Sequence, residues 1–138
     1  MRHFAAASLA FLAMGAQATV LDFSGSICSA SADGSGSFEA CANFSRINQG
    51  YGDSAGADVT YQSSPGSPNS MYYWVDSYSF LTSVAFGDVN STPTILIVPT
   101  TGNTVTLVGF DIGSWPNVDR VSQVTVLDLV VRSIIVVT

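Results

Sequence analysis

Lysine is absent from the sequence, and histidine occurs only once, as His3. Nucleic acids and anionic membranes are bound through clustered lysine and arginine side chains, so this composition argues against both as partners. Histidine and lysine are also the usual bases that activate a serine or cysteine nucleophile. The sequence therefore argues against a nucleophilic enzyme as well as against a nucleic-acid-binding protein.

Charged side chains of either sign are scarce. They make up 10% of the chain, against roughly a quarter in ordinary soluble domains. Ten acidic residues outnumber four arginines, which gives a net charge of −6. Serine, threonine, asparagine and glycine supply the polarity instead, as is common in extracellular β-domains. An acidic surface rich in oxygen ligands suits hard cations such as Ca²⁺.

The first 18 residues have the three parts of a secretory signal peptide. A short basic start precedes an apolar run at residues 4–15 and a small-x-small cleavage site, Ala-Gln-Ala, at residues 16–18. The run is too short to span a bilayer, which argues against the alternative of a retained membrane anchor. We expect cleavage before Thr19. Residues 19–138 then form one secreted domain, extracellular or periplasmic, with ten acids against three arginines, a net charge of −7.

The chain has two cysteines, Cys28 and Cys41, and both follow the predicted cleavage site. In an oxidising compartment the default expectation is a disulfide between them. Closing so short a loop contributes about 3 kcal/mol to stability in the chain-entropy model. A reactive thiol lacks an activating base here, and a zinc site lacks histidine partners.

Residues 104–129 contain the clearest strand pattern. Apolar and polar side chains alternate over residues 104–109 and 124–127, with a connection containing Gly, Pro and Asn at residues 113–119. Short strands with turns between them predict an all-β, antiparallel sandwich or barrel. The other elements predicted are strands at residues 19–23, 58–62, 71–78, 82–86 and 94–98, a tight turn at residues 100–103, and one helical turn at residues 38–47.

The final segment, residues 130–138, is apolar at almost every position and does not alternate. One interpretation is a fully buried central strand. The other is a truncated or altered end that leaves a hydrophobic edge prone to aggregation. The sequence leaves both open.

The strand patterns resemble secreted bacterial proteins of the PEP-CTERM class, whose amino-terminal portion looks like a galactose-binding-like β-sandwich of the jelly-roll kind. The resemblance implies such a sandwich and a setting in extracellular polysaccharide. The family ends in a Pro-Glu-Pro motif, a hydrophobic helix and a basic tail, which this chain lacks, so the resemblance also implies an incomplete chain. The matching residues are 19–23, 47–53, 58–61, 74, 82–86 and 105–128.

Calcium is the ionic ligand that the sequence favours. The candidate oxygen ligands are Asp22, Asp53, Asp58 and Asp128, with backbone carbonyls from the glycine-rich loop at residues 50–56. The spacing is not that of an EF-hand. The alternative is that Asp53 and Asp58 hydrogen-bond the backbone in turns around a strand.

A sugar site is predicted around the loop at residues 113–119. Sugar rings stack on exposed aromatic side chains, and polar side chains bind their hydroxyl groups. Trp115 and Tyr51 supply aromatic rings, and Asn117, Asp119 and Arg120 supply polar partners.

Residues 72–74, Tyr-Tyr-Trp, are a second source of aromatic rings. Tyr73 and Trp74 must face opposite sides of a strand, and we expect Trp74 to pack in the core. Arg46, like Arg120, is expected at the surface or in an ion pair.

Three functions remain after these exclusions. The first is a non-catalytic module that binds carbohydrate or associates with an extracellular polysaccharide matrix. The second is a structural surface or biofilm protein without a small ligand. The third is a glycan hydrolase, which requires two facing carboxylates in a groove.

Overall fold

The structure, a computed structural model, describes residues 18–76, 78, 80–113, 116, 121–129 and 132–137. Nearly all of the predicted signal peptide lies outside these residues. The described part is all-β, without a helix, as predicted. In this part of the chain, no helix has the length and apolar character that crossing a membrane requires. The strands are β1 (Cys28–Ser29), β2 (Arg46–Ile47), β3 (Ala57–Gln62), β4 (Tyr72–Trp74), β5 (Val84–Phe86), β6 (Thr94–Pro99), β7 (Val124–Leu129) and β8 (Arg132–Val137).

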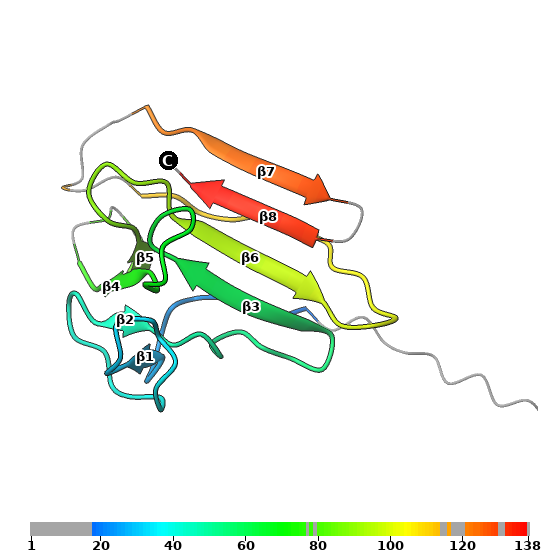
Figure 1. The fold of residues 1–138 in the computed structure, drawn as a ribbon. Helices are drawn as coiled ribbons and strands as arrows, with labels where there is room; N and C mark the ends of the chain where they lie inside the picture. Colours follow the sequence, from blue (N-terminus) through cyan, green and yellow to red (C-terminus); the bar gives the residue numbers. More distant parts are fainter. Residues whose placement is uncertain are drawn as a thin grey trace, which may run out of the picture.

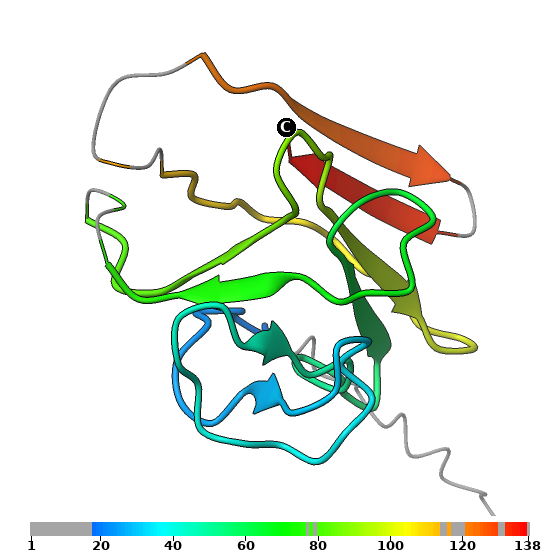
Figure 2. The same ribbon diagram turned by 60° about the vertical axis from the view of Figure 1, so that its left-hand side comes forward.

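These strands form two antiparallel sheets of four strands each (Figure 1). The first, with the order β1-β2-β4-β5, is made of strands of two or three residues, and we call it the small sheet. The second, with the order β3-β6-β8-β7, is made of six-residue strands, and we call it the long sheet. In Figure 2 the small sheet lies below and to one side of the long sheet. The predicted antiparallel arrangement is therefore confirmed.

Strand β3 shows how the sequence pattern becomes a sheet face. Ala57, Val59 and Tyr61 are buried, whereas Asp58 between them is exposed. Successive side chains of a strand point to opposite faces, so this alternation turns one face of β3 toward the core. The strand pairs with β6 over its whole length. The predictions for residues 58–62 and 94–98 are thus confirmed to within a residue at the ends.

Strand β8 lies between β6 and β7 and is hydrogen-bonded to both. Residues 132–137 therefore form a central strand, as one of the two interpretations of residues 130–138 predicted. A central position satisfies the backbone on both sides, which a non-alternating apolar run favours. The edges of the long sheet are β3 and β7.

The predicted strand at residues 104–109 is not formed, although its side chains alternate. The preceding turn is present, because the Asn103 N–H donates to the Thr100 carbonyl at 2.9 Å and Gly102 adopts a positive φ of 83°. Residues 103–113 then have no strand partner, and Val108 and Phe110 are exposed. Alternation indicates which side of a strand each residue would face, but a strand also needs a neighbouring strand to hydrogen-bond its backbone. Of the predicted pair, only β7 is formed, and its partner is β8.

The predicted strand at residues 19–23 and the predicted helical turn at residues 38–47 are also wrong. Phe23 has a φ of 54°, which interrupts an extended chain. Within the second segment Glu39 forms a two-way backbone bridge with Cys28, and Arg46 begins β2. Apolar residues at a spacing of three over so short a segment stabilise a helical turn less than these long-range backbone hydrogen bonds stabilise the observed conformation.

The core lies between the small sheet and β3. The Cys28–Cys41 disulfide, with Cα atoms 5.2 Å apart, ties β1 to the loop before β2, and this confirms the predicted bond. Leu21 and Phe23 pack against the core from the amino-terminal segment. The core residues are Ile27, Cys28, Ile47, Val59, Tyr61, Met71 and Tyr73.

Polar groups within this core are hydrogen-bonded. The buried Ser70 hydroxyl donates to the Ile47 carbonyl at 2.6 Å, and the Tyr61 hydroxyl donates to the Tyr51 carbonyl at 2.8 Å. Burial raises the pKa of Tyr61 far above its ordinary value, so the hydroxyl stays a neutral donor. Across the described residues, every buried side-chain nitrogen and oxygen has a partner.

We expect the double variant Cys28→Ala/Cys41→Ala to lose about 3 kcal/mol of unfolding free energy, because the unfolded chain gains freedom when the short loop opens. Urea unfolding followed by circular dichroism measures this change. Reductant should lower the midpoint of the parent and leave that of the variant unchanged. A parent insensitive to reductant would contradict the expectation.

We expect Ser70→Ala to cost about 1–3 kcal/mol, because it leaves the Ile47 carbonyl buried without its donor. Ser26→Ala, at an exposed serine in a turn, is the matched control and should change stability by less than about 0.5 kcal/mol. Equal effects of the two substitutions in urea unfolding would exclude a structural role for the buried hydroxyl.

Candidate functional site

Of the five predicted sugar-binding residues, the structure describes Tyr51. Trp115, Asn117, Asp119 and Arg120 lie outside the described residues, so that site stays a prediction. Tyr51 is half-buried and stacks on Tyr61, with ring centroids 6.1 Å apart. Its hydroxyl accepts from the Phe23 N–H at 2.8 Å and donates to Asp22 at 3.2 Å. Tyr51 therefore joins the amino-terminal segment to the core.

The predicted calcium ligands lie on separate elements. The backbone N–H and hydroxyl of Ser24 bind the Asp22 carboxylate and hold its pKa below the ordinary value. Asp53 accepts from the Val59 N–H at 2.7 Å, as expected of a turn residue, and Asp58 is exposed on β3. Where side chains are described, no three His, Cys, Asp or Glu residues form a group that could hold a metal ion. Asp128 lies in β7, and calcium binding stays a prediction.

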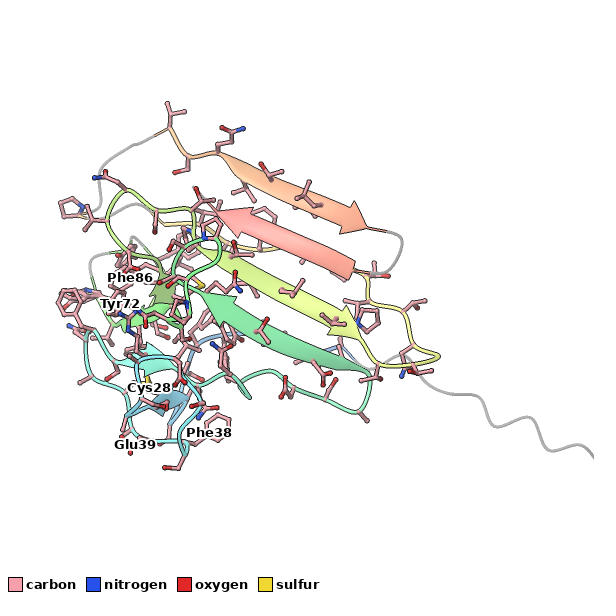
Figure 3. All side chains as sticks on the ribbon, viewed as in Figure 1. Cys28, Phe38, Glu39, Tyr72 and Phe86 are labelled. Atoms are coloured by element: carbon pink, nitrogen blue, oxygen red, sulfur yellow. A yellow bond between two sulfur atoms is a disulfide. The ribbon has the colours of Figure 1, made fainter. Side chains whose placement is uncertain are left out.

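The structure instead brings aromatic side chains together on the outer face of the small sheet. In β4, Tyr73 is only 8% exposed and packs in the core, whereas Tyr72 and Trp74 are half-buried. The two adjacent residues do face opposite sides as predicted, but the core position belongs to Tyr73 and not to Trp74. Tyr72 pairs with Phe86 of β5, and their rings stack at 5.2 Å (Figure 3).

Phe44 completes this aromatic group from the loop before β2. Its ring lies 4.7 Å from that of Trp74 and 6.0 Å from that of Phe86, nearly perpendicular to both at 82° and 72°. Its N–H donates to the Tyr73 carbonyl at 2.9 Å, and the Tyr73 N–H donates to Ser45. These backbone bonds fix the loop to β4 and set the position of the ring.

The backbone of Phe44 is strained. Its φ of 69° lies in the left-handed region, which costs a non-glycine residue about 1–2 kcal/mol. Despite this cost the residue is 61% exposed, so little of its surface is buried in return. Strained residues that the surrounding structure holds in place are concentrated at functional sites. Phe44 therefore marks this face as a candidate site.

Beside these rings is an open apolar hollow of about 330 Å³. We call it the aromatic hollow. Its volume lies within the roughly 300–1,000 Å³ of typical small-molecule sites. Burial raises the pKa of Tyr78, which therefore contributes a neutral hydroxyl. The residues that line it are Phe44, Trp74, Tyr78, Phe86, Gly87 and Val89.

A carboxylate adjoins the wall of the hollow. The Trp74 indole Nε1 donates to Asp76 Oδ1 at 2.8 Å, across an exposed surface. This bond fixes the indole and uses one oxygen of the carboxylate. Among the described residues, Asp76 Oδ2 has no hydrogen-bond partner and no basic group lies within 4.0 Å of Asp76.

Arg46 and Asp88 form a second polar group on the same face. The guanidinium lies 3.4 Å from the centre of the Tyr72 ring and donates to the Ser70 carbonyl at 2.6 Å. It is also 4.0 Å from Asp88 Oδ1, while Asp88 Oδ2 accepts from the Ser63 hydroxyl at 2.7 Å. The expected ion-pair role of Arg46 is confirmed. Its charge is directed inward to these partners.

The sequence contained a signal for part of this site. Tyr72 and Trp74 are two residues apart in a strand, which places both on one face. The contribution of Phe44 had no such signal, because it depends on a positive φ and on pairing with β4. Phe86 and Tyr78 are brought in by the register and by the loop after β4.

Comparisons with models of protein families, with curated proteins and with solved structures gave no match.

We expect Phe44→Gly to be more stable than Phe44→Ala by about 1 kcal/mol, the reverse of the usual order, because only glycine adopts the positive φ freely. Urea unfolding of both variants measures the difference. At Ala55, an exposed loop residue whose φ is not positive, Ala55→Gly should not stabilise the chain. An alanine variant at position 44 that is the more stable of the two would show that the backbone there is unstrained.

Proposed function

We propose that this protein is a secreted, non-catalytic β-sandwich module of the jelly-roll or galactose-binding-like kind that binds carbohydrate through the aromatic hollow. The observation that carries the proposal is an exposed ring, Phe44, held with a strained backbone at the edge of an apolar hollow.

The chemistry of a pyranose suits such a surface. The C–H face of a sugar ring packs against an aromatic ring, and the hydroxyl groups at its edge need hydrogen-bonding partners. Trp74, Phe44 and Phe86 supply the apolar walls. The Asp76 carboxylate, hydrogen-bonded to the Trp74 indole, supplies a polar group beside one of those walls.

An extracellular setting supports the same proposal. The disulfide belongs to an oxidising compartment, and the predicted signal peptide leads there. The resemblance to PEP-CTERM proteins favours an extracellular polysaccharide as the ligand. The alternatives are a structural surface or biofilm protein and a glycan hydrolase. The sequence has no lysine, and none of the six residues that line the hollow is acidic. Both observations favour binding over hydrolysis, which needs acid and base groups at the site.

We expect the purified protein to be retained on glycan arrays or insoluble polysaccharide, and Trp74→Ala or Phe44→Gly to lower retention at least about tenfold, since each removes a wall of the hollow. Phe38→Ala is the matched control, because Phe38 is an exposed ring far from Tyr72 and Phe86 (Figure 3). It should leave retention unchanged.

Trp115→Ala separates the two candidate sites. Retention lost in Trp115→Ala but kept in Trp74→Ala and Phe44→Gly would move the site to the loop at residues 113–119. No retention of the folded parent on any glycan would contradict the proposal and favour the structural alternative.

A further inference from the structure

We infer that the aromatic hollow selects sugars that carry a protonated amino group, such as glucosamine units, over neutral sugars. The inference rests on the proposed carbohydrate binding and names the chemical class of its ligand. Three features carry it: the charge of the chain, the position of the Asp76 carboxylate, of which Oδ2 has no partner among the described residues, and the arrangement of the rings.

The charge of the chain favours a cationic ligand. The protein has ten acidic residues against four arginines, and no lysine. Arg46 is the only basic residue whose side chain is described, and it is engaged by Tyr72, Ser70 and Asp88. The long-range field therefore attracts cations toward the surface and repels anionic sugars such as uronates.

The carboxylate of Asp76 gives this attraction a fixed position. Oδ1 is held by the Trp74 indole, so the side chain is anchored at a wall of the hollow. In the described part of the chain Oδ2 is left without a partner. An ammonium group is a donor with three hydrogens, and its hydrogen bond to a carboxylate oxygen is charge-assisted. A neutral hydroxyl at the same place makes a weaker bond.

The rings favour an ammonium group as well. Phe44 stands at 82° to Trp74 and 72° to Phe86, so the rings form walls at steep angles and not one flat platform. An ammonium within about 6 Å of ring faces is attracted by their quadrupoles, most strongly by tryptophan. The apolar walls still contact the C–H face of the sugar. One site would thereby contact both the apolar face and the ammonium group of an amino sugar.

The test is calorimetric titration of the full chain with three tetrasaccharides of the same β-1,4 linkage: glucosamine, N-acetylglucosamine and glucose. Glucosamine and glucose differ at carbon 2 by an ammonium group in place of a hydroxyl. We expect the glucosamine tetramer to bind about tenfold more tightly than the glucose tetramer at low salt. The difference should shrink as salt screens the carboxylate.

Asp76→Asn tests the assigned carboxylate. It keeps an oxygen to accept from the Trp74 indole and removes the charge, so the advantage of glucosamine should fall about tenfold while glucose binding persists. Asp58→Asn removes the charge of another exposed carboxylate, on β3, and should leave the preference unchanged. Tetralysine should bind less tightly than the glucosamine tetramer, because it lacks a sugar face for the rings.

The outcomes separate this inference from the proposed function. Equal binding of the glucosamine and glucose tetramers by the parent would overturn the inference and leave the carbohydrate module intact. Tetralysine binding as tightly as glucosamine would overturn it too, because charge alone would then suffice. Failure of all three tetrasaccharides, in a protein whose thermal melt shows it folded, would contradict the inference, while retention on the array glycans decides the proposed function separately.

Discussion

The side-chain alternation of β4 is the constraint on which the candidate site depends. Pairing with β2 on one side and β5 on the other fixes the direction of each residue. Tyr73 is thereby committed to the core, and Tyr72 and Trp74 to the outer face. A shift of one residue would bury Trp74 and expose Tyr73, which would remove the hollow and the core contact together. The register of β4 therefore determines both the packing of the core and the shape of the outer face.

Phe44 shows how the same pairing positions a residue outside a strand. Its backbone is bonded to Tyr73, so the loop before β2 follows β4 even where the chain is left-handed. The disulfide from Cys28 to Cys41 fixes that loop from its other end, a few residues earlier. The ring of Phe44 is thus held between a covalent bond and a hydrogen-bonded strand. Such rigid support keeps the cost of ordering a binding surface low.

The sequence predicted those parts of the fold that depend on local pattern. β3 and β6 have strong β-branched or alternating runs between turns, and the disulfide followed from having only two cysteines. The failures came where long-range pairing decided the outcome. Residues 104–109 alternate as a strand does but have no partner, and residues 38–47 have helical spacing but pair with β1 and β4.

The candidate site divides in the same way. The opposite orientations of Tyr73 and Trp74 were predictable from the strand period, but not which of them faces the core, since both are large aromatic residues. The position of Phe44 depends on a positive φ, which glycine adopts freely and which a phenylalanine in the sequence does not indicate. A site formed by a loop, a strand and a residue of the neighbouring strand has no continuous sequence pattern by which a single sequence could predict it.

The ion pair of Arg46 and Asp88 has a consequence for solubility. Exposed rings beside short edge strands are the surfaces through which β-proteins associate and precipitate. β5 is such an edge, and Phe86 lies in it. Arg46 covers one face of the Tyr72 ring and is 4.0 Å from Asp88, and the Asp76 carboxylate is bonded to the Trp74 indole. Charged groups next to exposed apolar strands oppose association through those strands, so the same side chains that shape the candidate site also bear on the solubility of this edge.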